Sequence, residues 1–359
     1  MKIGIDVSQV AYPGTGSAIY TKNLVSNLLK IDNNNSYNLF AGSWRRGTAI
    51  RNIFPQTRLW PLPPTALDLL WNRLGILNVE NLIGPVDVFH SSDWTQSPTK
   101  AAKVTTIHDL VVYKYPETLH PQIVSVHKRR LARVKKECDV IIAVSQNTKK
   151  DIVEILGISE NKIKVVYEAV GESFTKYKKT PHSGRPYILT VGTREPRKNL
   201  DRLVEAFSKI KNKDVELVIV GKYGWGTEIS NKQSTINNKI KLLGYVPQEK
   251  LLELYANAEA FVYPSLYEGF GIPVLEAMTV GCAVITSSIS SMSEVGGKAA
   301  IYVTPTDIND MAQKIDWVLE LSSSQRSDLI SKGYQQAKKF SWEKAARETL
   351  KIYEEVVCG

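Results

Sequence analysis

The chain has few cysteines and no long hydrophobic run. Its 359 residues include three cysteines, Cys138, Cys282 and Cys358, whose spacing fits neither a metal site nor a redox motif. We therefore expect structural or incidental thiols in a reducing compartment. No segment approaches the ~20 apolar residues of a membrane-spanning helix, and the opening residues MKIGIDVSQV lack the apolar core of a signal peptide. These absences predict a cytoplasmic protein and leave open peripheral attachment at the inner face of the plasma membrane.

Positive charge is concentrated in the first half of the chain. The net charge is +10 over the full sequence. Residues 1–180 contain 24 Lys and Arg against 15 Asp and Glu, or +9, and the remainder contributes +1. This asymmetry indicates that the first half faces an acidic partner. An anionic membrane, a phosphorylated acceptor and a nucleic acid all fit that description.

The length and the alternation of apolar runs with helical patterns predict an α/β protein with two Rossmann-like domains that face a central cleft. We expect domains at 1–172 and 187–340, a polar linker at 173–186, and a C-terminal helix at 341–359 that packs on the first domain. The expected strands are Lys2–Val7, Tyr37–Ala41, Val86–His90, Lys103–Ile107, Val140–Val144, Ile163–Val166, Tyr187–Val191, Glu216–Val220, Lys241–Leu243, Ala260–Tyr263 and Ala283–Thr286.

The segment Tyr263–Met278, YPSLYEGFGIPVLEAM, carries two carboxylates around a glycine-bracketed turn. We expect a helix to start at Pro273, with Glu276 in its first turn. Backbone N–H groups at such a turn favour phosphate, so Glu268 and Glu276 are placed to bind hydroxyls on either side of it. A simpler interpretation is that these glutamates only interact favourably with the helix dipole or face solvent.

Three cations, Arg194, Arg197 and Lys198, lie between an expected strand end and a helix start in TREPRKNL, Thr193–Leu200. Cations there oppose the helix dipole unless an anion compensates. Arginine suits bidentate phosphate contact and lysine acts as a compact charge. The segment therefore predicts a diphosphate clamp, with a solvated basic loop as the alternative.

In the first half, His108 and Asp109 follow an expected strand, where loops of α/β sheets build sites. A structural histidine is the competing interpretation. Gly14 and Gly16 follow the first strand, and Gly192 follows a later one. Neither loop is a full dinucleotide fingerprint, because an intact G-x-G-x-x-G with a downstream acidic residue is missing.

These motifs together resemble the family 4 glycosyltransferases of the GT-B fold. The resemblance rests on GTREPRKNL, YPSLYEGFGIPVLEAM, HDL and the early glycine loop, and extends in motif order over nearly the whole chain. It implies retaining transfer of a hexose from a nucleotide sugar, of the UDP-glucose or GDP-mannose type, to a glycan or lipid-linked acceptor in surface polysaccharide synthesis. It implies no cofactor and no essential metal, and the sequence contains no Asp-x-Asp motif.

The resemblance also implies residue roles. Arg197 and Lys198 would stabilise the departing diphosphate, Glu268 would bind sugar hydroxyls, and His108 would contact the transferred sugar. Either Arg194 or Arg197 would take the arginine role. The positions that would bind the donor are Gly16, Gly192, Thr193, Arg194, Tyr245, Val246, Phe270, Gly271, Ile272, Val274, Leu275 and Glu276. Among these, Glu276 would hold the ribose.

Other partners and functions stay open. His127–Lys136, HKRRLARVKK, has six Lys and Arg on an expected helix. It is either a solvated face or a surface that docks on an anionic membrane carrying a lipid-diphosphate acceptor. A sugar-nucleotide epimerase of the same fold is the enzymatic alternative. A basic protein that binds nucleic acid or an anionic surface is the non-enzymatic one, but no nucleic acid is expected because aromatic-interleaved basic stripes are missing.

Overall fold

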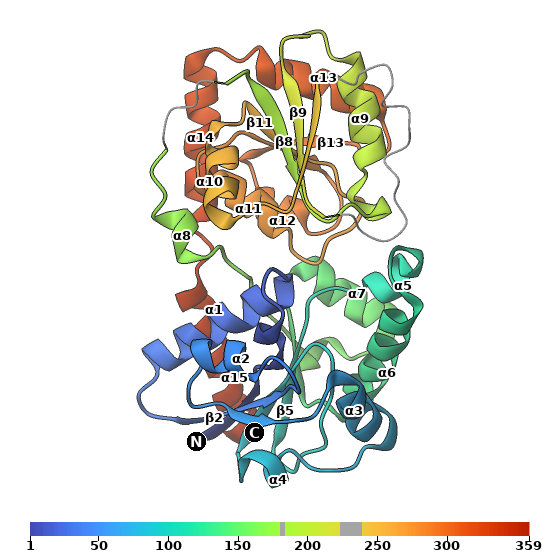
Figure 1. Ribbon diagram of the computed structural model, residues 1–359, viewed down its shortest axis with the longest axis vertical. Coiled ribbons are helices and arrows are strands. Elements are labelled where there is room, and N and C mark those ends of the chain that lie inside the picture. Colours follow the sequence, from blue (N-terminus) through green and yellow to red (C-terminus); the bar gives the residue numbers. More distant parts are fainter. Residues whose placement is uncertain (180–183, 223–238, 359) are drawn as a thin grey trace. The chain divides into compact units, whose positions relative to one another are not determined.

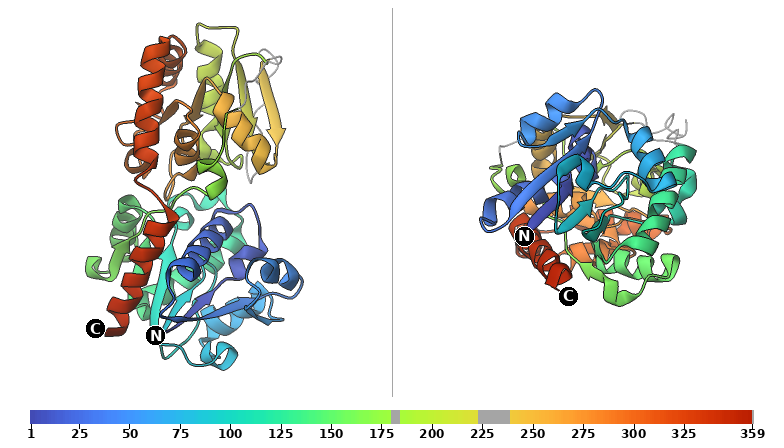
Figure 2. Two further views of the ribbon diagram at one scale, coloured as in Figure 1. Left: turned by 90° about the vertical axis from the view of Figure 1, so that its left-hand side faces the viewer. Right: turned by 90° about the horizontal axis from the view of Figure 1, so that it is seen from below.

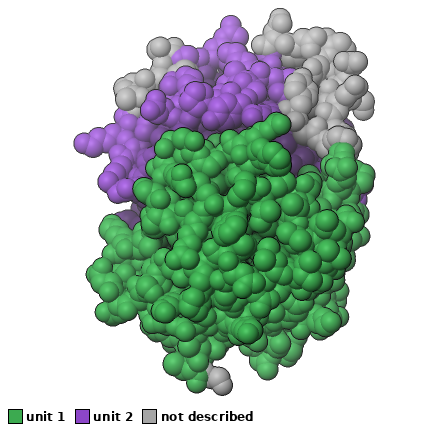
Figure 3. Space-filling view, turned by 60° about the horizontal axis from the view of Figure 1, so that its bottom comes forward, with its two compact units in different colours: residues 1–116, 120–168, 341–359 green, residues 117–119, 169–340 purple. Residues whose placement is uncertain are grey.

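The computed structural model describes residues 1–179, 184–222 and 239–358 (Figure 1). The chain divides into two compact units, coloured separately in Figure 3. Unit 1 comprises Met1–Pro116, His120–Glu168 and Ser341–Gly359, and unit 2 comprises Glu117–Leu119 and Ala169–Phe340. Among the described residues, no helix combines the length and the apolarity needed to cross a bilayer.

Unit 1 is built on a seven-stranded parallel sheet with the order β3-β2-β1-β4-β5-β6-β7. Its strands are β1 Lys2–Asp6, β2 Ser36–Gly42, β3 Arg58–Trp60, β4 Val88–Ser91, β5 Ala102–Ile107, β6 Val140–Ala143 and β7 Ile163–Val165. The central strands β1, β4 and β5 are mostly buried, as expected of a parallel sheet covered on both faces. Phe40 of β2 packs against Trp71, with ring centroids 5.2 Å apart.

The helices of unit 1 begin at residues suited to capping. Thr15 caps α1 through a bond from the Ala18 N–H, and Ser145 caps α7 through one from the Thr148 N–H. The helical elements are η1 Ser8–Ala11, α1 Gly16–Ile31, α2 Gly47–Ile53, α3 Pro64–Leu67, η2 Asp68–Leu74, α4 Glu80–Ile83, α5 Val111–Lys114, η3 Pro116–Thr118, α6 Pro121–Glu137, α7 Gln146–Leu156, η4 Glu160–Lys162 and α15 Trp342–Cys358.

The last helix, α15, belongs to unit 1 although it follows unit 2 in sequence. It lies beside α1 in both views of Figure 2 and contacts it along its length. Ser341 accepts a hydrogen bond from the Lys344 N–H at 3.1 Å and so caps the helix start. Buried Trp342 packs edge-on against Tyr20 of α1, with centroids 5.6 Å apart. The chain thus crosses back to complete the first unit.

Unit 2 has a six-stranded parallel sheet with the order β10-β9-β8-β11-β12-β13. The strands are β8 Tyr187–Val191, β9 Glu216–Val220, β10 Ile240–Gly244, β11 Ala260–Tyr263, β12 Val284–Ser287 and β13 Ala300–Val303. The helical elements are α8 Glu172–Thr175, η5 Pro196–Lys198, α9 Leu200–Lys209, α10 Gln248–Asn257, α11 Ile272–Thr279, α12 Met292–Gly296, α13 Ile308–Leu319 and α14 Ser323–Ala337. Helices α9 and α13 pack together over one face of the sheet, and α11 and α14 pack together on the other side (Figure 1).

The expected α/β class and parallel sheets are confirmed, and two strands were missed. The sequence analysis expected no strand at β3 or at β13. The expected helix start at Pro273 is wrong by one residue, because α11 begins at Ile272 after Gly271 adopts a left-handed conformation at φ 106°. Part of the expected linker, residues 180–183, lies outside the described residues.

Candidate functional site

Glycines shape the carboxyl ends of neighbouring strands in unit 2. The Gly192 N–H donates to the Val220 carbonyl at 2.9 Å, and the Gly221 N–H donates to the Gly244 carbonyl at 2.8 Å. A Cβ atom at Gly221 would lie 1.8 Å from the Gly192 carbonyl oxygen, so only glycine allows the loops after β8 and β9 to approach this closely. Gly192 was expected at the site, whereas Gly221 was not.

Two loops of unit 2 meet in one ion cluster. Lys198 Nζ lies 2.6 Å from Glu268 Oε1, and Arg197 Nη1 lies 2.9 Å from Glu268 Oε2. Arg197 Nε also lies 2.8 Å from Glu195 Oε2. These four side chains are between 10% and 15% exposed, and their formal charges cancel. A phosphate that entered here would therefore take over contacts that the carboxylates now make.

Burial and charge act in opposite directions on this cluster. Burial would raise the pKa of Glu268, but Lys198 and Arg197 outweigh it and lower the pKa to about 2. Burial also lowers the pKa of Lys198, against the influence of Glu268. Tyr263, which the sequence analysis did not single out, bonds to both partners: its hydroxyl lies 2.6 Å from Lys198 Nζ and 2.9 Å from Glu268 Oε1. Glu268 is thus an ionised carboxylate in a fixed position.

The loop that carries Glu268 is fixed by hydrogen bonds to its backbone. Ser290 Oγ accepts from the Glu268 N–H at 3.1 Å, and Ser291 Oγ donates to the Phe270 carbonyl at 2.8 Å. Asn199, left-handed at φ 62°, donates from Nδ2 to the Pro264 carbonyl at 3.1 Å. The carboxylate therefore sits on a rigid support, as a binding site requires.

Most side chains at the turn before α11 and in its first residues are buried in unit 2. Gly271 has φ 106°, which favours glycine, and a Cβ atom there would lie 2.3 Å from Met292 Cε and would displace that side chain. The side chains of Phe270, Val274 and Leu275 are buried in the unit, and the Val274 N–H already donates to the Gly271 carbonyl at 3.0 Å. Ile272 is half-buried at the first helical position.

Glu276 lies beyond the first turn of α11, so its expected position is wrong. The helix starts at Ile272, which makes Glu276 its fifth residue. Its Oε2 accepts a hydrogen bond from the Tyr255 hydroxyl at 2.9 Å. Burial raises the pKa of Glu276 to about 7, and the Tyr255 bond opposes that rise. A ligand with hydroxyl donors would stabilise the ionised form.

The other residues of unit 2 that were expected to bind the nucleotide-sugar donor differ in exposure. Arg194 is 2% exposed, and its backbone N–H donates to the Lys222 carbonyl at 3.0 Å. Thr193, next to it, is exposed. Tyr245 is 67% exposed, with Lys222 Nζ 5.1 Å from its ring centroid. Val246, next in the chain, is half-buried. Of the two arginines considered for the diphosphate, Arg197 is the one in contact with Glu268.

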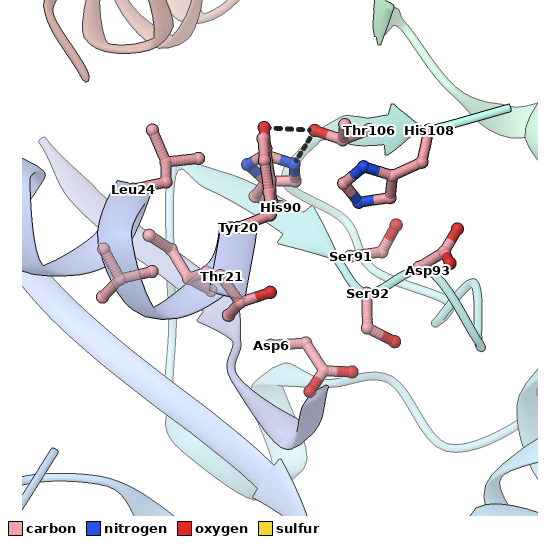
Figure 4. Close-up of a pocket in the computed structure, with 12 residues that line it drawn as sticks. Asp6, Tyr20, Thr21, Leu24, His90, Ser91, Ser92, Asp93, Thr106 and His108 are labelled. Carbon is pink, nitrogen blue, oxygen red and sulfur yellow. Dashed lines mark hydrogen bonds between the residues drawn. The ribbon is translucent and has the colours of Figure 1, made fainter. Parts of the chain in front are cut away.

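Unit 1 holds His108 at the end of β5, in a small cavity shown in Figure 4. His108 Nδ1 lies 2.8 Å from Glu168 Oε1, and its ring meets Tyr20 edge-on at 4.6 Å between centroids. Burial lowers the pKa of His108, but Glu168 outweighs this effect and the net pKa is raised. The Asp93 carboxylate lines the same cavity from the loop after β4. Glu168 was missed, although it follows a strand end as His108 does.

A second histidine of this cavity has a structural role. His90 Nδ1 lies 2.6 Å from the Tyr353 hydroxyl, and Nε2 lies 2.9 Å from Thr106 Oγ1. Burial lowers the pKa of His90 to about 3, so the ring is neutral. Gly16 starts α1, and a Cβ atom there would meet no heavy atom within 4 Å. The protein's own packing therefore does not demand glycine at that position.

The expected basic stripe His127–Lys136 is only partly exposed on α6. Arg129 pairs with Asp68 at 2.6 Å, Arg130 pairs with Asp93 at 3.3 Å, and Arg133 pairs with Glu137 at 2.5 Å. Arg130 is 1% exposed. Half of the cations in this stripe are thus engaged within unit 1. No group of three or more His, Cys, Asp or Glu suited to a metal occurs in the ranges that the structure describes.

Two family models match the chain. A family model described as Glycosyl transferases group 1 matches residues 172–336, and one described as Glycosyltransferase Family 4 matches residues 14–173. The matched ranges together run through both units. The chain is therefore a glycosyltransferase with the two parallel-sheet domains of the GT-B fold. It belongs to the family 4 glycosyltransferases, which confirms the resemblance found in the sequence.

Individual proteins support the same class. The chain is 29% identical over 281 residues to O-antigen chain mannosyltransferase B of Escherichia coli, covering 74% of each chain. Among solved structures, sucrose-phosphate synthase of Thermosynechococcus elongatus superposes with a TM-score of 0.76 at 18% identity, over 100% of this chain and 99% of that one. Anabaena HepE in complex with UDP and glucose gives 0.73 at 16% identity, over 99% and 100%.

Proposed function

We propose that this enzyme transfers a hexose, with retention of configuration, from a nucleotide sugar to a growing surface polysaccharide. The observation that carries the proposal is the buried cluster of Arg197, Lys198 and Glu268 at the carboxyl ends of β8 and β11. Two cations beside a turn rich in backbone N–H groups suit a diphosphate leaving group. The relative named as an O-antigen mannosyltransferase favours mannose as the sugar and a polysaccharide as the acceptor.

Different residues would bind different parts of the nucleotide-sugar donor. Arg197 and Lys198 would neutralise the diphosphate, and the backbone of Phe270–Ile272 would approach its oxygens. Glu268 would exchange its present ion pairs for sugar hydroxyls as the phosphate takes over the cations. Glu276 would accept hydrogen bonds from the ribose. From unit 1, His108 would contact the transferred sugar and Gly16 would let the loop before α1 come close to the diphosphate.

The chemical step needs no protein nucleophile. The bond from the anomeric carbon to the diphosphate oxygen breaks, and the acceptor hydroxyl attacks from the same side. Its proton passes to a phosphate oxygen, and the new glycosidic bond forms with configuration retained. Charge on the leaving group is the main obstacle, and fixed cations in a site of low dielectric are well suited to stabilise it. We infer that no metal is required, since Arg197 and Lys198 supply the positive charge.

The nucleobase of the donor is either guanine or uracil. The mannosyltransferase relative favours a GDP-mannose type donor, whereas the structural neighbour bound to UDP and glucose favours a UDP-glucose type donor. The acceptor would bind unit 1, and a lipid-linked acceptor would bring the protein to the inner membrane surface. The exposed lysines of α6, Lys128, Lys135 and Lys136, are the cations of that helix that remain for such a surface.

A thermal-shift comparison of UDP, GDP and ADP tests the proposal. A ligand that binds only the folded state raises the unfolding temperature, and at a fixed concentration a tighter ligand raises it more. We expect one of these nucleotides to stabilise the wild-type protein and its sugar conjugate to be consumed only when an acceptor is present. Interconversion of the free nucleotide sugar without transfer would indicate an epimerase. No stabilisation by any of the three would contradict the donor site.

A further inference from the structure

Unit 1 contains two adjoining cavities at the loops after β1, β2 and β4. Each has a volume of about 380 Å³, and Tyr12 and Pro64 line both. The inner cavity is bounded by Gln9 of η1 and by Asp93 and Trp94 after β4. The outer cavity is bounded by the loop Ser43–Arg46, between β2 and α2. The two shared lining residues show that the cavities adjoin, so an elongated molecule lying past Tyr12 and Pro64 would reach both.

The inner cavity offers polar groups to a sugar. The Gln9 side chain is 3% exposed, and its Nε2 finds no hydrogen-bond partner among the residues that the structure describes. A buried amide is normally paired, so an unpaired one on a cavity wall points to a ligand. Asp93 adds a partly exposed carboxylate, and the half-buried indole of Trp94 adds an apolar surface. Hydroxyl acceptors beside an aromatic ring are the usual features of a saccharide site.

The outer cavity has the opposite charge character. Arg45 and Arg46 are exposed, and the described residues that line the cavity include no carboxylate. The Arg46 guanidinium carbon lies 4.7 Å from the Tyr12 ring centroid, and Nη1 donates to the Ala11 carbonyl at 2.9 Å, which fixes its position. Trp44 is 73% exposed, and none of the described residues makes a ring contact or side-chain hydrogen bond with it. An exposed indole next to two arginines in the same loop suits a ligand with both an anionic and an apolar part.

We propose that the two cavities bind a single anionic acceptor. Its accepting sugar would lie in the inner cavity near Gln9 and Asp93. A phosphate or diphosphate ester on that sugar or on the next one would lie in the outer cavity against Arg45 and Arg46. This inference rests on the proposed function, because it describes the acceptor of that transfer. The same chemistry occurs in a lipid-linked diphosphate saccharide and in a water-soluble phosphorylated saccharide.

Binding can be followed at Trp44 without enzymatic turnover. The indole N–H resonance of Trp44, assigned through Trp44→Phe, is titrated with three probes: methyl α-mannoside, α-mannose 1-phosphate, and the mannosyl diphosphate of phenoxyundecanol. At 50 mM salt we expect the 1-phosphate to bind at least fivefold more tightly than the neutral glycoside. A diphosphate conjugate more than tenfold tighter than the 1-phosphate would identify the lipid-linked source. Equal affinity for the diphosphate conjugate and the 1-phosphate would identify the water-soluble phosphorylated saccharide as the source.

Substitutions in each cavity test the contribution of that cavity to binding. Arg45→Gln should weaken binding of α-mannose 1-phosphate at least fivefold and leave methyl α-mannoside unchanged. Arg51→Gln removes the same charge from exposed α2 outside both cavities and should change neither affinity by more than twofold. Gln9→Met, which keeps the side-chain length, should weaken all three probes without lowering the unfolding temperature. Thermal unfolding of each variant shows that it is folded.

Two results would overturn the inference. One is equal affinity for the phosphate and the neutral glycoside. The other is an Arg45→Gln variant that binds the phosphate as tightly as Arg51→Gln does. The proposed function has a separate readout, because UDP or GDP stabilises the protein through unit 2. Nucleotide stabilisation with no charge preference at Trp44 would contradict only the acceptor inference, whereas loss of nucleotide stabilisation would contradict the donor site.

Discussion

Lys198 Nζ and Glu268 Oε1 lie 2.6 Å apart, although 70 residues separate them in the sequence. From the sequence, Lys198 was expected at the diphosphate and Glu268 at the sugar. In the ligand-free protein they are partners, together with the Tyr263 hydroxyl and Arg197. The pair keeps a buried lysine and a buried carboxylate from being left uncompensated. A donor diphosphate that binds here, as we propose, would therefore redistribute an existing ion pair.

Lys198→Ala should lower kcat by roughly 100- to 1000-fold, the usual effect of losing one fixed group that stabilises transition-state charge. The folded state should survive, because Glu268 keeps its contacts with Arg197 and Tyr263. Lys211→Ala, which removes an exposed lysine of the same unit, is the matched control. Steady-state kinetics with the accepted donor measures the change. Turnover within threefold of the wild type in Lys198→Ala would remove Lys198 from the mechanism.

Glu276→Gln should weaken nucleoside diphosphate binding about tenfold or more, because hydrogen bonds from ribose hydroxyls to a charged acceptor are replaced by neutral ones. The amide oxygen can still accept from Tyr255, so the unfolding temperature without ligand should not fall. Glu249→Gln, an exposed substitution in α10, controls for the change of charge. Isothermal titration calorimetry with UDP and GDP gives the affinities. Unchanged affinity in Glu276→Gln would contradict the ribose assignment.

Nucleotide binding should release a proton near neutral pH. The pKa of Glu276 in the folded protein is about 7, above its ordinary value of 4.5. The carboxyl group is therefore about half protonated at pH 7, and hydroxyl donors favour the ionised form, so binding there should release about half a proton. Calorimetry in two buffers with different ionisation enthalpies measures this number. The release should vanish at pH 9 and in Glu276→Gln, whereas proton uptake on binding would refute the expectation.

The raised pKa of Glu276 also makes the stability of the folded protein depend on pH. Between pH 4.5 and 7 the folded protein holds a proton on Glu276 that the unfolded chain has already lost. This group's contribution to stability is present below pH 4.5 and is lost as the pH rises through about 7. Glu276→Gln should therefore stabilise the ligand-free protein more at pH 8 than at pH 5, relative to the wild type. Denaturant unfolding at the two pH values measures the difference, and equal effects would contradict burial of the carboxyl group.

Glu168 contacts His108, and we expect it to act as a positioning residue for the imidazole. Its carboxylate lies 2.8 Å from His108 Nδ1 and raises the pKa of the imidazole. Glu168→Gln should lower the pKa of His108 and shift the acidic limb of the rate profile in the same direction. Titration of the imidazole resonances by NMR measures the pKa, with His120 at the start of α6 as an internal control. A His108 titration that does not move would show that Glu168 only packs against the ring.

The pattern of parallel strands was predictable because most strands are buried apolar runs bounded by turn residues. Strand β3 was missed since its three residues, Arg58–Trp60, are partly exposed and lead into a proline-rich segment. Strand β13, AIYV at Ala300–Val303, is also short and only half-buried at its centre. Short strands at the end of a sheet depend on a neighbouring strand for their pairing. Local sequence therefore carries little signal for them.

The types of functional residue were predictable, but their pairings were not. Glycine, arginine and glutamate at strand ends indicated a phosphate site before any contact was known. The bonds from Arg197 to Glu268 and from His108 to Glu168 join segments 71 and 60 residues apart, and only the fold brings them together. The position of Glu276 was misjudged by a single residue because left-handed Gly271, rather than Pro273, sets the helix start.

The anomeric configuration of the transfer product tests the central claim most directly. The wild-type enzyme is incubated in excess EDTA with its nucleotide-sugar donor and an acceptor, and the new glycosidic linkage is followed by ¹H NMR from the earliest turnover. We expect the anomeric proton to show the same configuration as the donor, with nucleoside diphosphate formed in equal amount, and we expect Lys198→Ala to form this product at least about 100-fold more slowly. An inverted linkage, or transfer that stops in EDTA and resumes with a divalent cation, would contradict a retaining reaction driven by Arg197 and Lys198.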